Sequence, residues 1–253
     1  MTSKRAPLPL AAYTYAEFLA VAAAFLPIMT VSHLRHGDDA TQRLPGRWMR
    51  RFARTATRLT PAWQFSWEGT PPPDIADHAY VIVSNHESNA DPFLLSYMPW
   101  DMRWVAKEEI FKLPFLGLLM RAGGDIKLRR GDKASIHEMF DACLATLSGG
   151  VSVMMFPEGT RSKDGKLLPF KDGAFRLAID AQVPVLMMAL AGTRDCMPKG
   201  SGGLGHAKAK VRILEAIPTK GLTEADVPAL RERVRDRIGA AVEELRAEMG
   251  IVL

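Results

Sequence analysis

The chain has 253 residues, of which 47% are hydrophobic and 24% are charged. This composition excludes wholesale disorder and collagen-like repetition, and the length fits one large domain or two small ones. Two cysteines are too few for a disulfide-rich secreted scaffold and fit a reducing compartment. The 33 Lys and Arg outnumber the 28 Asp and Glu, and the net charge of +5 favours nucleic acid, a membrane surface or an anionic substrate as the partner.

The excess positive charge lies entirely within the first seventy residues. This segment holds nine basic side chains, Lys4, Arg5, Arg35, Arg43, Arg47, Arg50, Arg51, Arg54 and Arg58. It holds four acidic ones, Glu17, Asp38, Asp39 and Glu68, so nine minus four gives +5 and residues 71–253 are neutral. Because the neutral remainder offers no second basic surface to follow a nucleic-acid backbone, a membrane surface is the favoured partner.

The longest apolar run, residues 10–31, lies in the same segment. As a helix it would be about 33 Å long, just enough to cross the hydrocarbon core of a bilayer. Glu17 is costly inside a bilayer, and we expect Pro27 to kink or end the helix. A segment that lies in one leaflet is therefore at least as plausible as a span. A signal peptide is the competing interpretation, but no convincing small-x-small cleavage site follows Pro27.

Residues 47–59 are predicted to form an amphipathic helix. Its apolar arc of about 100° is followed by a neighbouring arc of arginines. The apolar arc contains Trp48, Phe52, Thr55, Ala56 and Leu59, and the basic arc contains Arg47, Arg50, Arg51, Arg54 and Arg58. This pattern favours an interfacial helix with guanidinium groups on lipid phosphates, although an ordinary packed helix with solvated arginines shows the same pattern. We therefore expect a membrane-associating helical pair in residues 1–62, followed by a domain in residues 63–253.

From residue 64 onward, short apolar runs alternate with helical patterns. The predicted strands are 64–68, 80–84, 102–106, 125–128, 151–156, 184–190 and 210–215. The predicted helices are 92–98, 111–121, 134–147 and 173–181, with a C-terminal helix capped by Asp226 and with Pro228 in its first turn. This alternation predicts an α/β fold with a mixed, largely parallel sheet covered by helices.

A histidine and an aspartate follow the strand at 80–84. His86 leaves the strand at the end where α/β sheets place their ligands, and Asp91 precedes Pro92 as a natural N-cap of the next helix. The intervening loop can fold His86 back onto the carboxylate, which would leave the other ring nitrogen to accept a proton. A structural histidine beside a capping aspartate is the alternative. A second H-x4-D pair, His33 and Asp38, has no strand before it and is interpreted as accidental.

Cationic and small residues follow three other predicted strands. The segment Phe156–Ser162 offers Gly159 for close backbone approach, Thr160 as a donor and Arg161 as a fork for a phosphate. Lys107 follows the strand at 102–106, and Arg129 with Arg130 follows the strand at 125–128. Together with His86 these residues describe a basic pocket beside a general base. Since no Ser or Cys lies in a nucleophile elbow, the acceptor substrate would bring its own hydroxyl nucleophile, and the apolar segment indicates a lipid acceptor.

These motifs resemble those of the glycerolipid acyltransferase family of 1-acyl-sn-glycerol-3-phosphate acyltransferase type. The likeness covers about residues 45–220 in one order. It comprises Asn85-His86-x4-Asp91, Lys107-Glu108-Glu109 with Pro114 and Gly117, Gly124 to Arg130, Phe156 to Ser162, Phe170-Lys171-x-Gly173 and Val183-Pro184. The resemblance implies a glycerol-3-phosphate acyltransferase-like fold and an N-terminal helical pair docked to a membrane.

The resemblance also implies the chemistry. A fatty acyl group would pass from acyl-CoA or acyl carrier protein, the co-substrates, to the free hydroxyl of 1-acyl-sn-glycerol-3-phosphate, giving phosphatidic acid without a metal or other cofactor. His86 would be the base and Asp91 its orienting partner. The implied acceptor-binding residues are Lys107, Arg130, Glu158, Gly159, Thr160 and Arg161. The expected location is a membrane surface on its cytoplasmic face, the inner membrane in a bacterium, with no nucleic-acid partner.

Three positions depart from the family pattern. Glu87 stands where glutamine is common after the histidine, and Arg129 stands where aspartate precedes the arginine. The sequence Met188-Ala189-Leu190 lacks the proline that is common in the last strand block. These departures leave another lyso-lipid acceptor open, and a lipid or thioester hydrolase in which His86 activates water is a second alternative. A non-catalytic membrane-binding module is a third.

Overall fold

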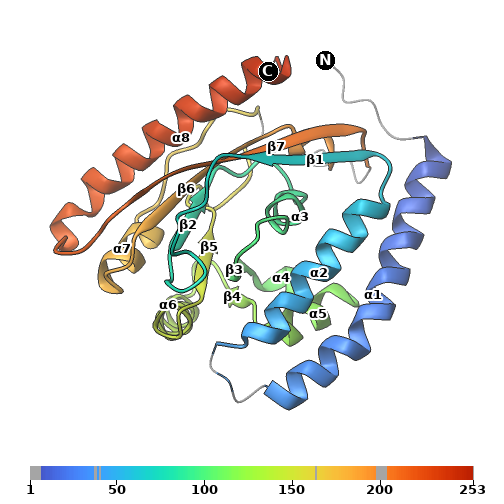
Figure 1. Ribbon diagram of the computed structural model, residues 1–253, viewed down its shortest axis with the longest axis horizontal. Helices are drawn as coiled ribbons and strands as arrows, with labels where there is room; N and C mark the ends of the chain where they lie inside the picture. The colour runs from blue at the N-terminus through green and yellow to red at the C-terminus, as the bar shows by residue number, and fades with distance from the viewer. Residues whose placement is uncertain (1–6, 37–38, 40, 163, 198–203, 253) are drawn as a thin grey trace.

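The computed structural model describes residues 7–36, 39, 41–162, 164–197 and 204–252, with one seven-stranded sheet at its centre (Figure 1). The strand order is β1-β7-β6-β2-β5-β3-β4. The strands are β1 (Trp63–Glu68), β2 (Val81–Ser84), β3 (Met102–Lys107), β4 (Ile126–Leu128), β5 (Ser152–Met155), β6 (Val185–Ala191) and β7 (Ala207–Ile217). All neighbouring pairs are parallel except β6 with β7. The predicted α/β class with a mixed, largely parallel sheet is confirmed.

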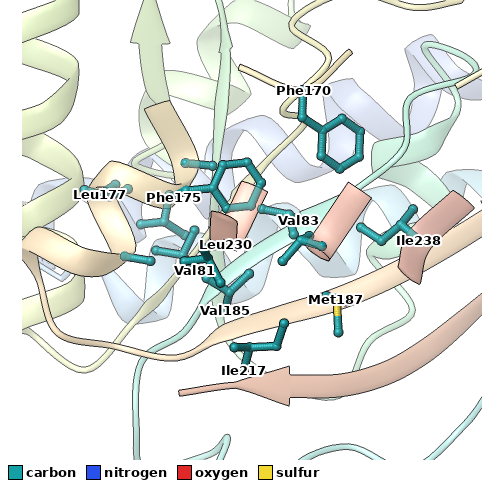
Figure 2. Close-up of a cluster of buried hydrophobic side chains, with 14 of the residues drawn as sticks. Val81, Val83, Phe170, Phe175, Leu177, Val185, Met187, Ile217, Leu230 and Ile238 are labelled. Atoms are coloured by element: carbon teal, nitrogen blue, oxygen red, sulfur yellow. The ribbon is translucent and has the colours of Figure 1, made fainter. Parts of the chain in front are cut away.

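The central strands are apolar along their whole length because helices cover both faces of the sheet. One face packs against α6 (Lys133–Ser148), α7 (Gly173–Asp180) and α8 (Val227–Met249). Figure 2 shows this cluster, in which Val81, Val83 and Met187 of the sheet meet Phe175 of α7 and Ile238 of α8. On the other face, Ile82, Met154 and Leu186 share one register row and pack with Leu94 of α3 (Asp91–Leu95). The expected segments 64–68, 80–84, 102–106, 125–128, 151–156, 184–190 and 210–215 each coincide with one of these strands.

The two N-terminal helices, α1 (Leu8–His36) and α2 (Arg43–Leu59), lie together on the side of the sheet opposite α8 (Figure 1). They pack on each other and on α5 (Leu116–Ala122) through an aromatic cluster in which Phe18 and Phe25 contact Phe52. Phe18 also contacts Phe93 of α3, so the helical pair is joined to the body. Whether residues 1–62 and 63–253 are separate domains stays a prediction.

Pro27 does not end the helix, because α1 continues through this residue to His36. The other expected outcome, a kink at Pro27, stays a prediction. A proline removes a single backbone hydrogen bond, and the packing of Leu26 and Met29 against α2 and α5 holds the helix across that gap. The helix is therefore about 44 Å long. It is long and apolar enough to cross a membrane by length and composition, and most of it is exposed. Glu17 is buried against α2, where it accepts a hydrogen bond from Thr60 at 3.0 Å.

The prediction of one helix at 111–121 was also wrong, since two short helices stand there. The first is α4 (Glu108–Phe111), and α5 begins after Phe115, whose φ is +59°. Pro114 cannot donate a backbone hydrogen bond and disfavours helical geometry at the residue before it, so the chain turns here. The helix expected at 92–98 ends early, at Leu95.

The C-terminal helix begins where it was expected, but its predicted cap was wrong. The Asp226 carboxylate makes no capping bond to α8. It instead accepts the N–H of Thr223 and closes a capping box around the short helix η2 (Glu224–Asp226). Pro228 does lie in the first turn of α8, and the apolar positions Leu230, Val234 and Ile238 are buried as predicted.

The arginines of α2 do not form the single surface stripe that its periodicity indicates. Arg50 is buried and pairs with Asp101, which also receives Arg43 at 3.5 Å and Arg47 at 3.0 Å. Helical periodicity gives the direction of a side chain but not what covers it, and here the chain before β3 supplies a buried carboxylate. Arg51, Arg54 and Arg58 pair with no carboxylate of the described residues. Leu59, expected in the apolar arc, is exposed, whereas Phe52 and Ala56 are buried.

Candidate active site

His86 and Asp91 meet in the loop that follows β2. His86 Nδ1 lies 2.7 Å from Asp91 Oδ2, and the same oxygen accepts the backbone N–H groups of Glu87 at 2.8 Å and Ser88 at 3.0 Å. The other oxygen, Oδ1, accepts the hydroxyl of Thr193 from the short helix η1 (Thr193–Asp195). The loop thus winds around a fully buried carboxylate, and the expected approach of the two side chains is present.

The role of Asp91 as an N-cap was predicted wrongly. The helix α3 begins at Asp91 itself, Ala90 occupies the N-cap position, and no side chain caps the helix. The Asp91 carboxylate turns back to the loop because it has better donors there: two backbone N–H groups, a hydroxyl and a ring nitrogen. Four donors on one carboxylate fix its position and, through it, the plane of the imidazole.

The imidazole is held from a third side by Phe156. The two rings stack at 4.1 Å between centroids and 13° between planes, and Trp104 stacks behind Phe156 at 6.5 Å. The His86 side chain is 16% exposed. With a carboxylate on Nδ1 the proton belongs on that nitrogen, so Nε2 carries the lone pair that can accept a proton from a substrate.

Glu158 is predicted to shape a phosphate site, but its carboxylate bonds to the protein. It is buried, and it accepts the N–H of His86 at 2.6 Å on one oxygen and the N–H of Leu168 at 2.9 Å on the other. Burial is the main cause that raises the pKa of this carboxyl to about 7. Glu158 therefore ties the loop after β5 to the loop after β2 and sets the position of the His86 backbone.

The neighbours of Glu158 lie closer to solvent. Gly159 has φ +65°, a conformation that favours glycine, and a Cβ there would lie 3.1 Å from Lys171 Cε and Nζ. Thr160 is exposed and Arg161 is half-buried. Lys171 stands in the Phe170-Lys171-x-Gly173 motif, where no role was predicted for it. Its ammonium adds a positive charge beside the glycine.

The cationic candidates lie along one edge of the sheet. Strands β2, β5, β3 and β4 are adjacent and parallel, so their carboxyl ends share this edge. His86 follows β2, Arg161 follows β5, Lys107 ends β3 opposite Leu128, and Arg130 follows β4. At about 4.8 Å between strands, Lys107 is on a strand about 10 Å from that of His86, and Arg130 about 14 Å. Lysine and arginine side chains can reach across much of that distance.

Arg129 and Arg130 differ although they are adjacent. Arg129 binds Glu108 at 2.7 Å and Asp132 at 3.0 Å, which is consistent with its replacing an aspartate of the family pattern without adding a free charge. Arg130 forms no hydrogen bond or ion pair with another described residue, and it is exposed. Of the two, Arg130 is the one that is available to a ligand.

Sequence reasoning missed three contributors to this site: the Thr193 hydroxyl on Asp91, the Phe156 ring on His86, and a buried ion pair. In the ion pair Glu87 Oε1 lies 2.7 Å from Arg246 Nη2 of α8. Glu87 was noted only as a departure from glutamine. None of these contacts has a local signal, since Thr193 and Arg246 are more than 100 residues from the loop they contact.

Comparison with known proteins gives the same assignment for the domain. Residues 67–191 match the model of the family described as Acyltransferase. The human protein 1-acyl-sn-glycerol-3-phosphate acyltransferase alpha is 36% identical over 173 residues, 67% of this chain and 60% of that protein. The Brassica napus protein 1-acyl-sn-glycerol-3-phosphate acyltransferase BAT2, chloroplastic, is 41% identical over 143 residues, 56% of this chain and 42% of that protein. The chain belongs to the acyltransferase family.

One solved structure extends the likeness to nearly the whole chain. The acyltransferase chain resembles the crystal structure of the 1-acyl-sn-glycerophosphate (LPA) acyltransferase PlsC from Thermotoga maritima with a TM-score of 0.73 and 26% identity. The match covers 94% of this chain and 96% of that one. The chain spans about 60% of the length of the human relative. Among the described residues, no group of three or more His, Cys, Asp and Glu side chains could hold a metal ion.

Proposed function

We propose that this acyltransferase transfers a fatty acyl group from acyl-CoA or acyl carrier protein to the free hydroxyl of 1-acyl-sn-glycerol-3-phosphate, forming phosphatidic acid. The observation that carries the proposal is the 2.7 Å contact of His86 Nδ1 with the buried Asp91 carboxylate at the carboxyl end of β2. The cations on the neighbouring strand ends and the names of the similar proteins support the choice of acceptor.

In the proposed reaction His86 Nε2 accepts the proton of the acceptor hydroxyl as its oxygen attacks the thioester carbonyl carbon. The new C–O bond forms and the C–S bond breaks, and the leaving thiolate takes the proton from the imidazolium. Asp91 stabilises the positive charge that develops on the ring and keeps the proton on Nδ1. The products are the diacyl lipid and free CoA or acyl carrier protein, and no step uses a metal or other cofactor.

The acceptor phosphate is proposed to bind between Lys107, Arg130 and Arg161, with Gly159 and Thr160 allowing close approach. The strands that carry Lys107 and Arg130 lie about 10 Å and 14 Å from that of His86, and the long side chains can reach from there toward a phosphate bound beside the imidazole. Arg161 offers a fork that matches a phosphate, and Lys171 beside Gly159 adds charge. Glu158 contributes indirectly by holding the loop, because its two oxygens are already bonded.

The acceptor and product are lipids, so we propose that the enzyme works on a membrane surface, on its cytoplasmic face where acyl-CoA and acyl carrier protein are found. The exposed apolar residues of α1, among them Leu19, Ile28 and Leu34, support this location. Arg51, Arg54 and Arg58 of α2 supply positive charge for anionic headgroups. We propose no nucleic-acid partner.

The test is acyl-CoA turnover, followed as thiol release, with and without lysophosphatidic acid and across a panel of lyso-lipid acceptors. We expect thiol release to depend on the acceptor and phosphatidic acid to accumulate in equal amount. Thiol release that is independent of the acceptor would identify a hydrolase. Preference for a lyso-lipid without a phosphate monoester would reject lysophosphatidic acid as the acceptor and the phosphate site with it.

A further inference from the structure

A buried ion pair joins the C-terminal helix to the loop of His86. Arg246 of α8 is 4% exposed, and its Nη2 lies 2.7 Å from Glu87 Oε1 and 2.7 Å from the carbonyl oxygen of Gly165. Its Nη1 also contacts Glu243 at 2.9 Å. Glu87 follows His86 directly in the chain and is buried too. A charged pair removed from water in this way is often no more stabilising than an apolar pair of the same volume, so stability alone is a poor reason for it.

The second carboxylate oxygen of Glu87 is connected to Asp91 through Gly192 and Thr193. Glu87 Oε2 accepts the N–H of Gly192 at 3.1 Å. Gly192 follows β6 directly and has φ +94°, and a Cβ there would lie 2.1 Å from the carbonyl oxygen of Lys208, so the backbone at this point has little freedom. The next residue, Thr193, donates its hydroxyl to Asp91. The turn at Gly192 therefore determines where one of the four donors to Asp91 lies.

Buried carboxylates outnumber buried guanidinium groups here. Asp91, Glu87 and Glu158 lie around the His86 loop, and Arg246 is the one arginine among the described residues bonded to any of them. Asp91 and Glu158 are stabilised by N–H and hydroxyl donors. Glu87 has a single backbone donor, and burial raises the pKa of its carboxyl, an effect that the Arg246 guanidinium opposes. Arg246 is thus what allows an ionised Glu87 to stay in place and hold Gly192.

We propose that Glu87 and Arg246 are positioning residues, which act through Gly192 and Thr193 to hold Asp91 and hence the imidazole of His86. The inference rests on the proposed function, in which His86 is the base. Neither residue touches the reacting atoms in this arrangement. A misplacement of about 1 Å at a reacting group can lower the rate a hundredfold, so removal of the pair should lower kcat with little change in KM.

The decisive comparison uses two double variants that leave no unpaired buried charge. Glu87→Met/Arg246→Met removes the acceptor of the Gly192 N–H, whereas Glu87→Gln/Arg246→Met keeps an amide oxygen there at nearly the same volume. We expect the first to unfold within about 5 °C of the wild type, with kcat about tenfold to a hundredfold lower and KM for both substrates within about threefold. The second should recover at least half of that loss on a logarithmic scale.

Wild-type kcat in the Glu87→Met/Arg246→Met protein would overturn the inference, and so would equal kcat values in the two double variants. If the methionine pair does not fold, Arg246→Lys replaces it: the lysine keeps the charge but cannot bond Glu87 and Gly165 with one planar fork, and wild-type kcat there would also overturn the inference. The wild type and His86→Ala run in the same assay. A wild type without acceptor-dependent turnover would reject the proposed function, whereas an active wild type with unaffected double variants rejects this inference alone.

Discussion

Two clusters of charge lie at opposite edges of the same sheet. The catalytic cluster, named for the proposed role of His86, lies at the carboxyl ends of the parallel strands and consists of His86, Glu87, Asp91, Glu158 and Arg246. The clamp, at the amino end of β3, consists of Arg43, Arg47, Arg50, Asp101, Arg103 and Asp125. The first is rich in carboxylates and the second is rich in guanidinium groups.

The two clusters also differ in how well their carboxylate oxygens are satisfied. In the catalytic cluster every carboxylate oxygen of Asp91, Glu87 and Glu158 accepts a hydrogen bond. In the clamp, Asp125 Oδ2 is buried without a hydrogen-bond partner among the described residues. Each cluster also has one buried guanidinium nitrogen without such a partner, Arg103 Nε in the clamp and Arg246 Nε in the catalytic cluster. The first arrangement fixes directions, which a proton transfer requires. The second joins α2 to the sheet, because Arg47 and Arg50 of α2 both donate to Asp101 and Arg50 also donates to the carbonyl of Met102.

The largest expected effect separates the clusters by function. We predict that His86→Ala lowers kcat about a thousandfold to ten-thousandfold, because the general base is lost. The midpoint of thermal unfolding should stay within about 3 °C, since the side chain is at the surface of the cluster. His78→Ala is the matched control, because His78 is exposed and its ring lies 3.4 Å from Asp74, so its loss should leave activity unchanged. A His86→Ala protein with more than a tenth of wild-type activity would contradict the role of this histidine.

The clamp should show the opposite behaviour, with a loss of stability and little loss of activity. Arg103 is 1% exposed, donates to the carbonyl groups of Met102 and Thr41, and lies against Gly46 of α2. We predict that Arg103→Met lowers the free energy of unfolding by about 3 kcal/mol, because Asp125 then loses its nearest positive charge. Urea unfolding measures this loss.

The double variant Arg103→Met/Asp125→Leu is the control for that prediction, and it should regain most of the stability because no buried charge is left unpaired. The kcat of Arg103→Met should stay within about threefold of wild type, since Arg103 is four residues, about 13 Å, from the carboxyl end of β3. Equal stability of wild type and Arg103→Met would show that the clamp contributes nothing.

The fold and the contact of His86 with Asp91 were predictable because their signals are local. His86, Asp91 and Pro92 follow a strand in this order. Their position could be predicted from the local preference of each residue and from the rule that α/β sheets place ligands at the carboxyl ends of their strands. The ion pairs of Arg50 and Arg246 were not predictable, because an arginine in an amphipathic helix has the same pattern whether water or a carboxylate covers it. Arg50 and Arg246 are buried by contacts with residues 51 and 159 positions away, respectively. The break at Phe115 did have a local signal in Pro114, which the helical periodicity of its neighbours masked.

The arginines of α2 that lie outside the clamp test the proposed binding to a membrane surface. Arg51 lies over the Trp48 ring at 4.6 Å and Arg58 over the Tyr97 ring at 6.0 Å, and Arg54 lies between them. At about 1 kcal/mol for each charge near an anionic surface, changing all three to glutamine should weaken binding to anionic vesicles about a hundredfold at low salt. Sedimentation with vesicles measures this.

Arg47→Gln is the matched control on the same helix. Its charge is already engaged by Asp101 at 3.0 Å, so we expect vesicle binding to fall by less than about threefold. The binding of the triple variant should also depend less on salt than that of the wild type. Unchanged vesicle binding by the triple variant would assign the attachment to the apolar residues of α1 alone.

The smallest expected effect concerns one carboxyl from each cluster, Glu158 and Asp125, since burial raises the pKa of both to about 7. A folded pKa above the unfolded one means that the stabilising contribution is complete below about pH 4 and is lost as the pH rises through 7. Wild-type stability should therefore fall over this range. Glu158→Gln and Asp125→Asn should each remove the contribution of one carboxyl to this fall. Urea unfolding of each variant should therefore show a smaller difference in stability between pH 4.5 and pH 8 than the wild type shows. If either variant keeps the full wild-type difference in stability between the two pH values, the carboxyl that it replaces is ionised at both of them. The corresponding cluster then holds one more negative charge at low pH than a raised pKa implies.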